Sequence, residues 1–193
     1  VRLVKDMTQP DTIIINYADH GAVYQSLADE ISAIDPPVWG RLIASYLLKR
    51  NYSVQILDAV ALRMGLDTTV SEIGAANPGL VILLASGHQP SSSTQLMDSV
   101  ISLSLRLKQE YPEIPLLIVG PHPAALPELT LRETEADFVC TGDGPLAAER
   151  VLELLQNKNW RWISKANLKG VCFWDHDNIL MGDSLPNTAV SDM

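Results

Sequence analysis

The stretch Ile114-Pro-Leu-Leu-Ile-Val-Gly-Pro-His-Pro-Ala-Ala-Leu-Pro-Glu128 joins a short apolar run to a loop rich in proline. The run from Leu116 to Val119 is typical of a strand buried on both faces of a parallel sheet. It stops at Gly120, and ligands of open parallel sheets lie outside the carboxyl ends of the strands. A flat ligand could lie directly on the backbone of a residue without a side chain. An ordinary strand-to-helix loop explains the same residues, so both interpretations stay open at this point.

Apolar strand patterns alternate with helical patterns along most of the chain, which predicts an α/β protein with a parallel sheet. The expected strands are residues 12–17, 53–58, 79–85, 114–119 and 137–140. The expected helices are residues 36–50, 68–76, 93–110, 128–135 and 145–156, the first capped by Asp35. Right-handed crossovers place helices on both faces. The pattern predicts a flavodoxin-like (Rossmann-like), five-stranded parallel sheet with order 2-1-3-4-5, plus a C-terminal β-hairpin.

Three segments are expected along the chain. Residues 1–11 form an N-terminal arm, and residues 12–157 form the α/β domain. Residues 158–193 form a linker with a β-hairpin, made by residues 169–174 and 179–181, whose polar tail leads to a further domain that is absent.

Composition bounds the function. Of the 193 residues 47% are hydrophobic, which suits a globular core, and no apolar run reaches the roughly 18 residues of a membrane span. The net charge of −9 argues against a nucleic-acid partner, because no basic stripe neutralises phosphates. Two cysteines, Cys140 and Cys172, are too few for a disulfide scaffold and indicate a cytoplasmic protein, and the apolar run around Cys140 predicts that its thiol is buried. The oligomeric state is left open.

Unusual residues follow four of the five expected strands, and they would gather at one edge of the sheet. Glycine recurs among them, which indicates a large ligand close to the backbone. These candidate ligand-binding residues are Asp19, His20, Ser86, Gly87, His88, Gly120, Pro121, His122, Gly142, Asp143 and Gly144.

Other chemistries fit these loops poorly. No P-loop lysine and no G-x-G-x-x-G follows the first strand, and a phosphorelay receiver would need an aspartate where Ala85-Ser86 stands. Ser86 has no recognisable base, so no catalytic residue is predicted. Three histidines (His20, His88 and His122) could meet at the edge, but the chain offers them no matching carboxylate or thiolate, so no metal site is predicted.

Three motifs in order carry a family resemblance over about residues 12–157. The segment Asp35-Pro-Pro-Val-Trp-Gly40 with the helix and strand after it, the Gly120-Pro-His-Pro123 loop, and Asp137-Phe-Val-Cys-Thr-Gly-Asp-Gly144 resemble the N-terminal cobalamin (vitamin B12)-binding domain of B12-dependent radical SAM enzymes. Residues 169–174 resemble the hairpin that leads into the catalytic barrel of those enzymes.

The resemblance implies that cobalamin lies across the carboxyl edge of the sheet, with its nucleotide tail beside the third and fourth strands, past Ser86 and Gly120. Gly142 and Gly144 would border the tail. The Asp-x-His-x-x-Gly motif that supplies a cobalt ligand in methionine-synthase-like domains is missing, because Asp19 and His20 are adjacent; no histidine ligation of cobalt is expected. His122 is then expected to order its loop. Val119 stands where the family usually has a second glycine.

The same resemblance implies a radical SAM barrel as the partner domain in the parent chain, which would be a methyltransferase or a tetrapyrrole-type cyclase. S-adenosylmethionine and a [4Fe-4S] cluster would bind there, since the Cys-x-x-x-Cys-x-x-Cys site and the length of a barrel are missing here. No catalysis is expected from this fragment alone. Two alternatives remain: a cofactor-free interaction domain of the same fold, and a small hydrolase or transferase using His20, His88 or His122.

Overall fold

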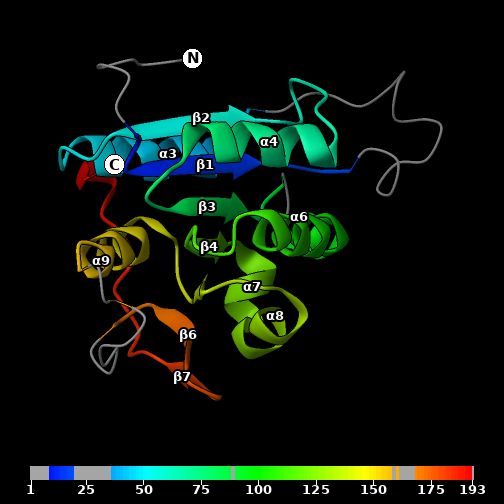
Figure 1. Ribbon diagram of the computed structural model, residues 1–193. Coiled ribbons are helices and arrows are strands. Elements are labelled where there is room, and N and C mark those ends of the chain that lie inside the picture. The colour runs from blue at the N-terminus through cyan, green and yellow to red at the C-terminus, as the bar shows by residue number, and fades with distance from the viewer. Residues whose placement is uncertain (1–8, 20–35, 88–89, 158–159, 161–167, 193) are drawn as a thin grey trace.

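The computed structural model of the protein describes residues 9–19, 36–87, 90–157, 160 and 168–192. These residues form a seven-stranded sheet with strand order β2-β1-β3-β4-β5-β6-β7 (Figure 1). The strands are β1 (Thr12–Asn16), β2 (Val54–Asp58), β3 (Val81–Leu84), β4 (Leu116–Val119), β5 (Phe138–Cys140), β6 (Val171–Asp175) and β7 (Asn178–Met181). The first five are parallel, which confirms the predicted order 2-1-3-4-5.

The predicted C-terminal hairpin is present, but it extends the sheet. β6 pairs antiparallel with β5, and β7 pairs with β6. Phe173 and Cys172, both buried, lie opposite Phe138 and Val139. β6 thus covers an apolar strand that would otherwise be an exposed edge. The expected end of the α/β domain at residue 157 therefore falls between β5 and β6, which pair in one sheet.

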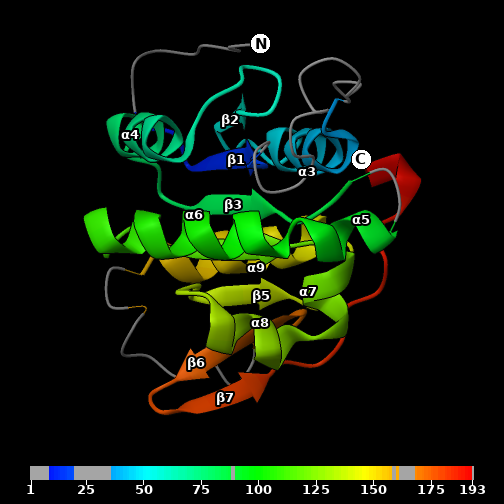
Figure 2. The same ribbon diagram turned by 90° about the vertical axis from the view of Figure 1, so that its right-hand side faces the viewer.

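Helices cover both faces of the sheet, as predicted. They are α3 (Val38–Leu48), α4 (Leu66–Ala76), α5 (Pro90–Gln95), α6 (Met97–Glu110), α7 (Pro121–Ala125), α8 (Pro127–Glu133) and α9 (Pro145–Leu155). Figure 2 looks onto the face covered by α4, α6 and α8, with α9 behind the sheet. Residues of α3 and α9 belong to the core on the other face.

Two cores arise from the alternation of side chains along each central strand. Ile13 and Ile15 of β1 lie in the core under α4 and α6, whereas Ile14 lies in the core under α3 and α9. β3 and β4 alternate in the same way. Because both faces are buried, these strands read as continuous apolar runs in the sequence.

Gly40 explains why α3 lies so close to the sheet. A Cβ atom there would stand 2.8 Å from Leu84 Cδ1 and 3.3 Å from Ile14 Cγ2. The glycine of the Pro-Pro-x-x-Gly segment therefore serves helix–sheet packing.

Helix boundaries differ from the predictions at three places. α3 begins at Val38, with Pro37 at its N-cap position; Asp35 lies outside the described residues. The predicted helix over 93–110 is two helices, α5 and α6, on either side of Leu96. α7 was not predicted; it starts directly after Gly120 with Pro121, a residue whose fixed φ suits a first helical position.

The segment after β7 turns back onto the domain, which differs from the expected linker. Gly182 donates to Val171 O, and Gly170 donates to Asp183 O. Thr188 is buried, and the chain then forms the short helix η2 (Val190–Asp192). Lys49 Nζ at the end of α3 donates to Ser191 O over 3.4 Å. In Figure 1 this segment runs past α9 toward α3.

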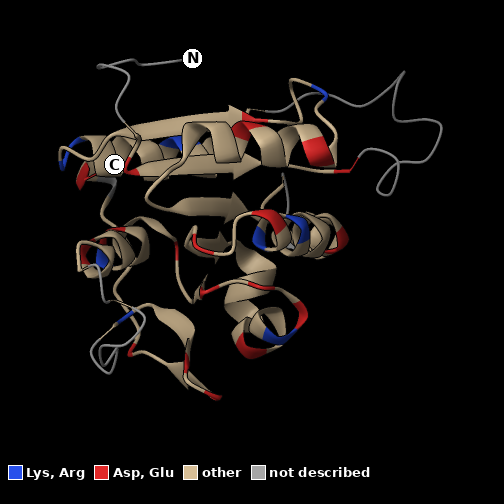
Figure 3. Ribbon diagram, viewed as in Figure 1, with Lys and Arg blue, Asp and Glu red and all other residues tan. Residues whose placement is uncertain are grey.

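Basic residues are interspersed with acidic ones on α6, α8 and α9 (Figure 3). Among the described residues, no helix has the length and apolar character that crossing a membrane requires.

Candidate functional site

The predicted site residues that the structure describes do follow the carboxyl ends of neighbouring parallel strands. Asp19 follows β1, Ser86 and Gly87 follow β3, Gly120 to His122 follow β4, and Gly142 to Gly144 follow β5. His20 and His88 lie outside the described residues. We call this edge of the sheet, with the loops that leave it, the carboxyl edge.

The loops after β3 and β4 are in direct contact at Gly120. A Cβ atom on Gly120 would stand only 2.0 Å from Ala85 O and 3.0 Å from Ala85 Cβ. Ala85 N–H donates to Val119 O at 2.7 Å, so the strands are still paired here. The close approach that requires glycine is thus between two strands. The sequence interpretation considered only a ligand close to the backbone of Gly120 and did not predict this contact with Ala85.

His122 is tied to α5 by two hydrogen bonds. Its backbone N–H donates to Ser93 Oγ at 3.0 Å, and its Nδ1 lies 3.0 Å from Thr94 Oγ1. The side chain is half-buried. These contacts suit the predicted loop-ordering role.

The loop after β5 contains two glycines with opposite surroundings. Gly144 has a φ of +106°, and a Cβ atom there would stand 2.9 Å from Ile43 Cδ1 and 3.0 Å from Val119 Cγ1. Gly144 is therefore required by its backbone and by packing against α3 and β4. Gly142 is exposed, and nothing lies within 4 Å of where its Cβ atom would be. Of the two, Gly142 presents open backbone to a ligand.

Asp143, between these glycines, is engaged by the C-terminal segment. Its carboxylate accepts the backbone N–H of Thr188 at 2.6 Å and the Thr188 hydroxyl at 3.2 Å. This contact was not predicted, because the partner lies 45 residues further along the chain.

At the end of β1, polar groups also find partners within the protein. Asn16 Nδ2 donates to Asp58 Oδ1 at 2.8 Å, and the backbone N–H of Asp19 donates to Ser99 Oγ at 2.9 Å. Burial raises the pKa of Tyr17, and nearby Asp19 adds to the effect. Tyr17 is therefore a neutral core residue.

Large apolar side chains are exposed around the same edge. Val38 and Trp39 open α3, which starts at this edge, and they are 59% and 42% exposed. Leu62 follows β2 and is 63% exposed, and Leu126 separates α7 from α8 and is 46% exposed. Apolar side chains exposed at such an edge are available to contact an apolar ligand.

The described residues of the carboxyl edge include neither a reactive thiol nor a group of metal ligands. Cys140 and Cys172 are free and buried, as predicted for Cys140, and they lie in cores on opposite faces of the sheet. Burial raises the pKa of Cys140 to about 11, which keeps the thiol protonated. In the described part of the chain no three His, Cys, Asp or Glu side chains are placed to hold a metal ion.

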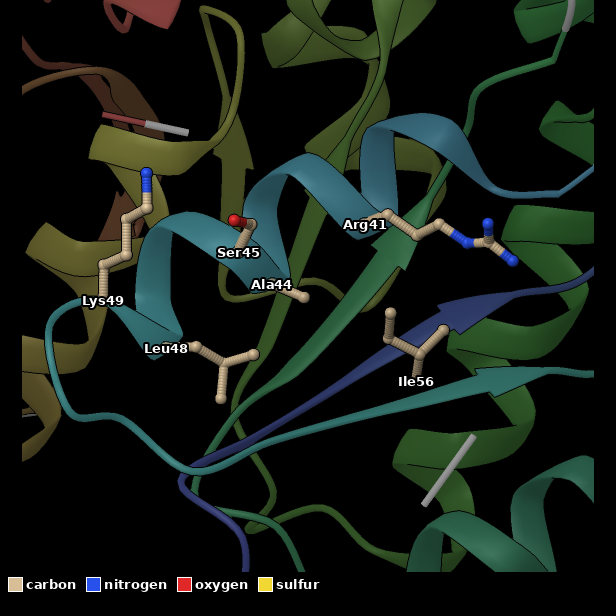
Figure 4. A pocket seen from close by; sticks show the side chains of 6 residues that line it. All are labelled: Arg41, Ala44, Ser45, Leu48, Lys49 and Ile56. Atoms are coloured by element: carbon tan, nitrogen blue, oxygen red, sulfur yellow. The ribbon is translucent and has the colours of Figure 1, made fainter. Parts of the chain in front are cut away.

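A groove of about 470 Å³ lies elsewhere, between α3 and β2 (Figure 4). It is lined by Arg41, Ala44, Ser45, Leu48, Lys49 and Ile56. Of the predicted site residues that the structure describes, none is among these lining residues.

Sequence reasoning missed Ser93, Thr94 and Thr188. The first two belong to a run of serines and a threonine directly after the loop of the third strand, and hydroxyl residues there are a usable signal. Thr188 lies in a polar tail that carries no local signal.

Comparison with known proteins shows the family. The B12 binding domain family matches residues 25–152, so the chain belongs to that family. The match confirms the family resemblance seen in the sequence and the cobalamin cofactor that it implies. No curated protein matches the chain significantly.

The fold is similar to parts of two solved enzymes. One is the cobalamin-dependent S-adenosylmethionine radical enzyme OxsB, solved with aqua-cobalamin and S-adenosylmethionine bound (TM-score 0.63, 12% identity, 93% of this chain and 23% of that chain). The other is the radical S-adenosylmethionine methyltransferase TsrM from Kitasatospora setae, solved with cobalamin and a [4Fe-4S] cluster bound (TM-score 0.64, 11% identity, 95% of this chain and 30% of that chain). The chain thus spans less than a third of the length of these neighbours.

Proposed function

We propose that this domain holds cobalamin across its carboxyl edge, with the nucleotide tail beside β3 and β4, past Ser86 and Gly120. The observation that carries the proposal is the family match, because residues 25–152 include the loops after β2, β3, β4 and β5. Gly142 supports it, since open space surrounds its Cβ position where the family resemblance puts the tail. The exposed side chains of Trp39 and Leu126 supply apolar surface for a macrocycle.

We also propose that no histidine of this chain ligates cobalt. Asp19 and His20 are adjacent, so the Asp-x-His-x-x-Gly spacing is missing, and His122 Nδ1 is already hydrogen-bonded to Thr94. When bound, the corrinoid would supply the cobalt chemistry of methyl transfer or of radical control. The chain's own part is to bind and orient it.

In the parent protein, we propose, a radical SAM barrel that binds S-adenosylmethionine and a [4Fe-4S] cluster follows this domain. OxsB and TsrM support this proposal, because each is a much longer chain of which the present fold covers 23% to 30%. The expected reaction class is a methyltransferase or a cyclase acting in the cytoplasm.

Titration of the protein with hydroxocobalamin, followed by absorbance, tests the proposal. We expect a stoichiometric complex whose spectrum is that of cobalamin with its nucleotide base released from cobalt, because the tail would be held by the protein. Absence of a complex at high micromolar cofactor would refute cobalamin binding by this domain. A complex whose spectrum retains the coordinated base would refute the path of the tail.

A cofactor-free interaction domain is the second candidate, and one observation favours it. Val119, which replaces a glycine usual in the family, packs with Ile43 against Gly144 and fills the space between β4 and the loop after β5. Replacing Val119 by glycine distinguishes the two: a variant that gains cobalamin binding absent from the wild type would show a domain that has lost its cofactor.

A further inference from the structure

Ser93 connects the ends of β3 and β4 from within the protein. It lies in the short helix α5 and is 0% exposed. Its hydroxyl donates to Ala85 O and accepts the backbone N–H of His122 at 3.0 Å. One side chain therefore pairs with one backbone group from each of the two loops.

The need for this hydroxyl follows from Pro121. β3 and β4 pair in parallel with Leu84 opposite Val119, and Ala85 N–H continues the ladder to Val119 O. In this register the next donor, to Ala85 O, would be the N–H of residue 121. Proline has no N–H, so the ladder would leave a buried carbonyl without a donor. Ser93 supplies that donor and then accepts the first N–H after the proline, that of His122.

Two further contacts fix the same junction. Gly120 lets the backbone of β4 lie directly against Ala85 O, and Thr94 Oγ1 lies 3.0 Å from His122 Nδ1. The loops after β3 and β4 are thus held to each other through α5.

We propose that Ser93 is a positioning residue for the nucleotide tail of cobalamin. This inference rests on the proposed function, in which the nucleotide tail lies beside β3 and β4 and passes Ser86 and Gly120. Because Ser93 is fully buried, it acts through the backbone of its two partners and does not touch the ligand. Two loops that are already held in place lose less conformational entropy when a ligand binds to them, which raises the affinity. Only the nucleotide tail should respond to a change at Ser93, since the proposed contacts of the corrin ring are the exposed side chains of Trp39 and Leu126.

The test compares two corrinoids, hydroxocobalamin and cobinamide, which lacks the nucleotide tail. Ser93→Ala leaves Ala85 O and His122 N–H unpaired and should weaken hydroxocobalamin binding about tenfold or more, which corresponds to about 1.4 kcal/mol. Cobinamide binding should change by less than about twofold. Ser93→Thr keeps the hydroxyl and should restore most of the affinity.

Ser104→Ala is the matched control. Ser104 is also a serine of 0% exposure, but its hydroxyl donates only within α6, to Ile101 O at 2.8 Å. This variant should bind both corrinoids like the wild type. Amide hydrogen exchange without any corrinoid adds a second readout: the His122 amide should exchange faster in Ser93→Ala and at the wild-type rate in Ser104→Ala.

The outcomes separate the two proposals. A Ser93→Ala protein that binds hydroxocobalamin like the wild type, or that loses both corrinoids equally, would overturn the role of Ser93 alone. Wild-type protein that binds neither corrinoid would overturn cobalamin binding and the role of Ser93 with it.

Discussion

The two edges of the same sheet are built in opposite ways. At the amino edge, where the parallel strands begin, Lys108 Nζ lies 2.6 Å from Asp137 Oδ2 and donates also to Ile114 O. The same carboxylate accepts the N–H of Leu116, and the two side chains are only 9% and 13% exposed. At the carboxyl edge Gly142 is open, and Trp39 and Leu62 are exposed. The difference teaches that the two ends of one motif, Asp137 to Gly144, have different tasks. Asp137 holds the starts of the strands together, whereas Gly142 leaves open backbone at the carboxyl edge.

Breaking the amino edge should have the largest effect on stability. Asp137→Ala leaves the Lys108 ammonium buried without its carboxylate and removes the acceptor of Leu116 N–H. Loss of one partner of a buried pair typically costs about 3–5 kcal/mol in the free energy of unfolding. Urea unfolding of the variant measures it. Glu153→Ala is the control, because its pair with Arg150 is nearly half exposed and should cost less than about 1 kcal/mol.

Gly120→Ala should damage the carboxyl edge almost as much. The new methyl would stand 2.0 Å from Ala85 O, so β3 and β4 must separate. Forced overpacking of this kind costs about 3 kcal/mol. Unfolding by denaturant gives the value, and near-wild-type stability would show that the two strand ends are not in contact.

Raising the pH should lower the free energy of unfolding by a smaller amount, through Cys140 at the end of β5. Burial raises the pKa of Cys140 from 9.0 to about 11, so the folded protein holds the thiol proton more tightly than the unfolded chain. This contribution is complete below pH 9 and is lost as the pH rises through 11, and it amounts to at most a few kcal/mol, roughly 1.4 kcal/mol for each tenfold change in proton affinity. Cys140→Ala should show a shallower fall in stability between these pH values than the wild type. Equal slopes would contradict a shifted thiol.

Gly142→Leu should have the smallest effect on stability and the clearest effect on binding. Its side chain would enter open space, so the free energy of unfolding should change by less than about 0.5 kcal/mol. Hydroxocobalamin binding should nevertheless be abolished, because the leucine occupies the space proposed for the tail. Gly65→Leu is the matched control for the change in the free energy of unfolding, since Gly65 is equally open and lies at the start of α4. Retained binding by Gly142→Leu would move the ligand away from the loop after β5.

Sequence patterns predicted the parallel strand order and both helix layers, because buried strands and amphipathic helices leave local signals. They missed what depends on contacts between distant residues. Gly120 was singled out as a ligand contact, but a glycine that faces a ligand and one that faces Ala85 O look alike in a sequence. The short helix α7 was not predicted, because two of its five residues are prolines, which usually indicate a loop. Asp143 was chosen as a ligand contact, and only the folded chain shows that Thr188 already holds it.

The contact between Asp143 and Thr188 also has a thermodynamic consequence. A ligand that binds the Asp143 carboxylate must displace Thr188. The C-terminal segment, Gly182 to Asp192, and that ligand therefore compete for one carboxylate. Thermodynamic linkage makes the competition reciprocal. The factor by which docking of the C-terminal segment lowers the affinity for the ligand equals the factor by which the ligand lowers the docking equilibrium of that segment. Truncation before Thr188 would therefore raise the affinity for any ligand that uses this carboxylate. The C-terminal segment is in that sense an internal competitor, and its own sequence determines how strongly it competes.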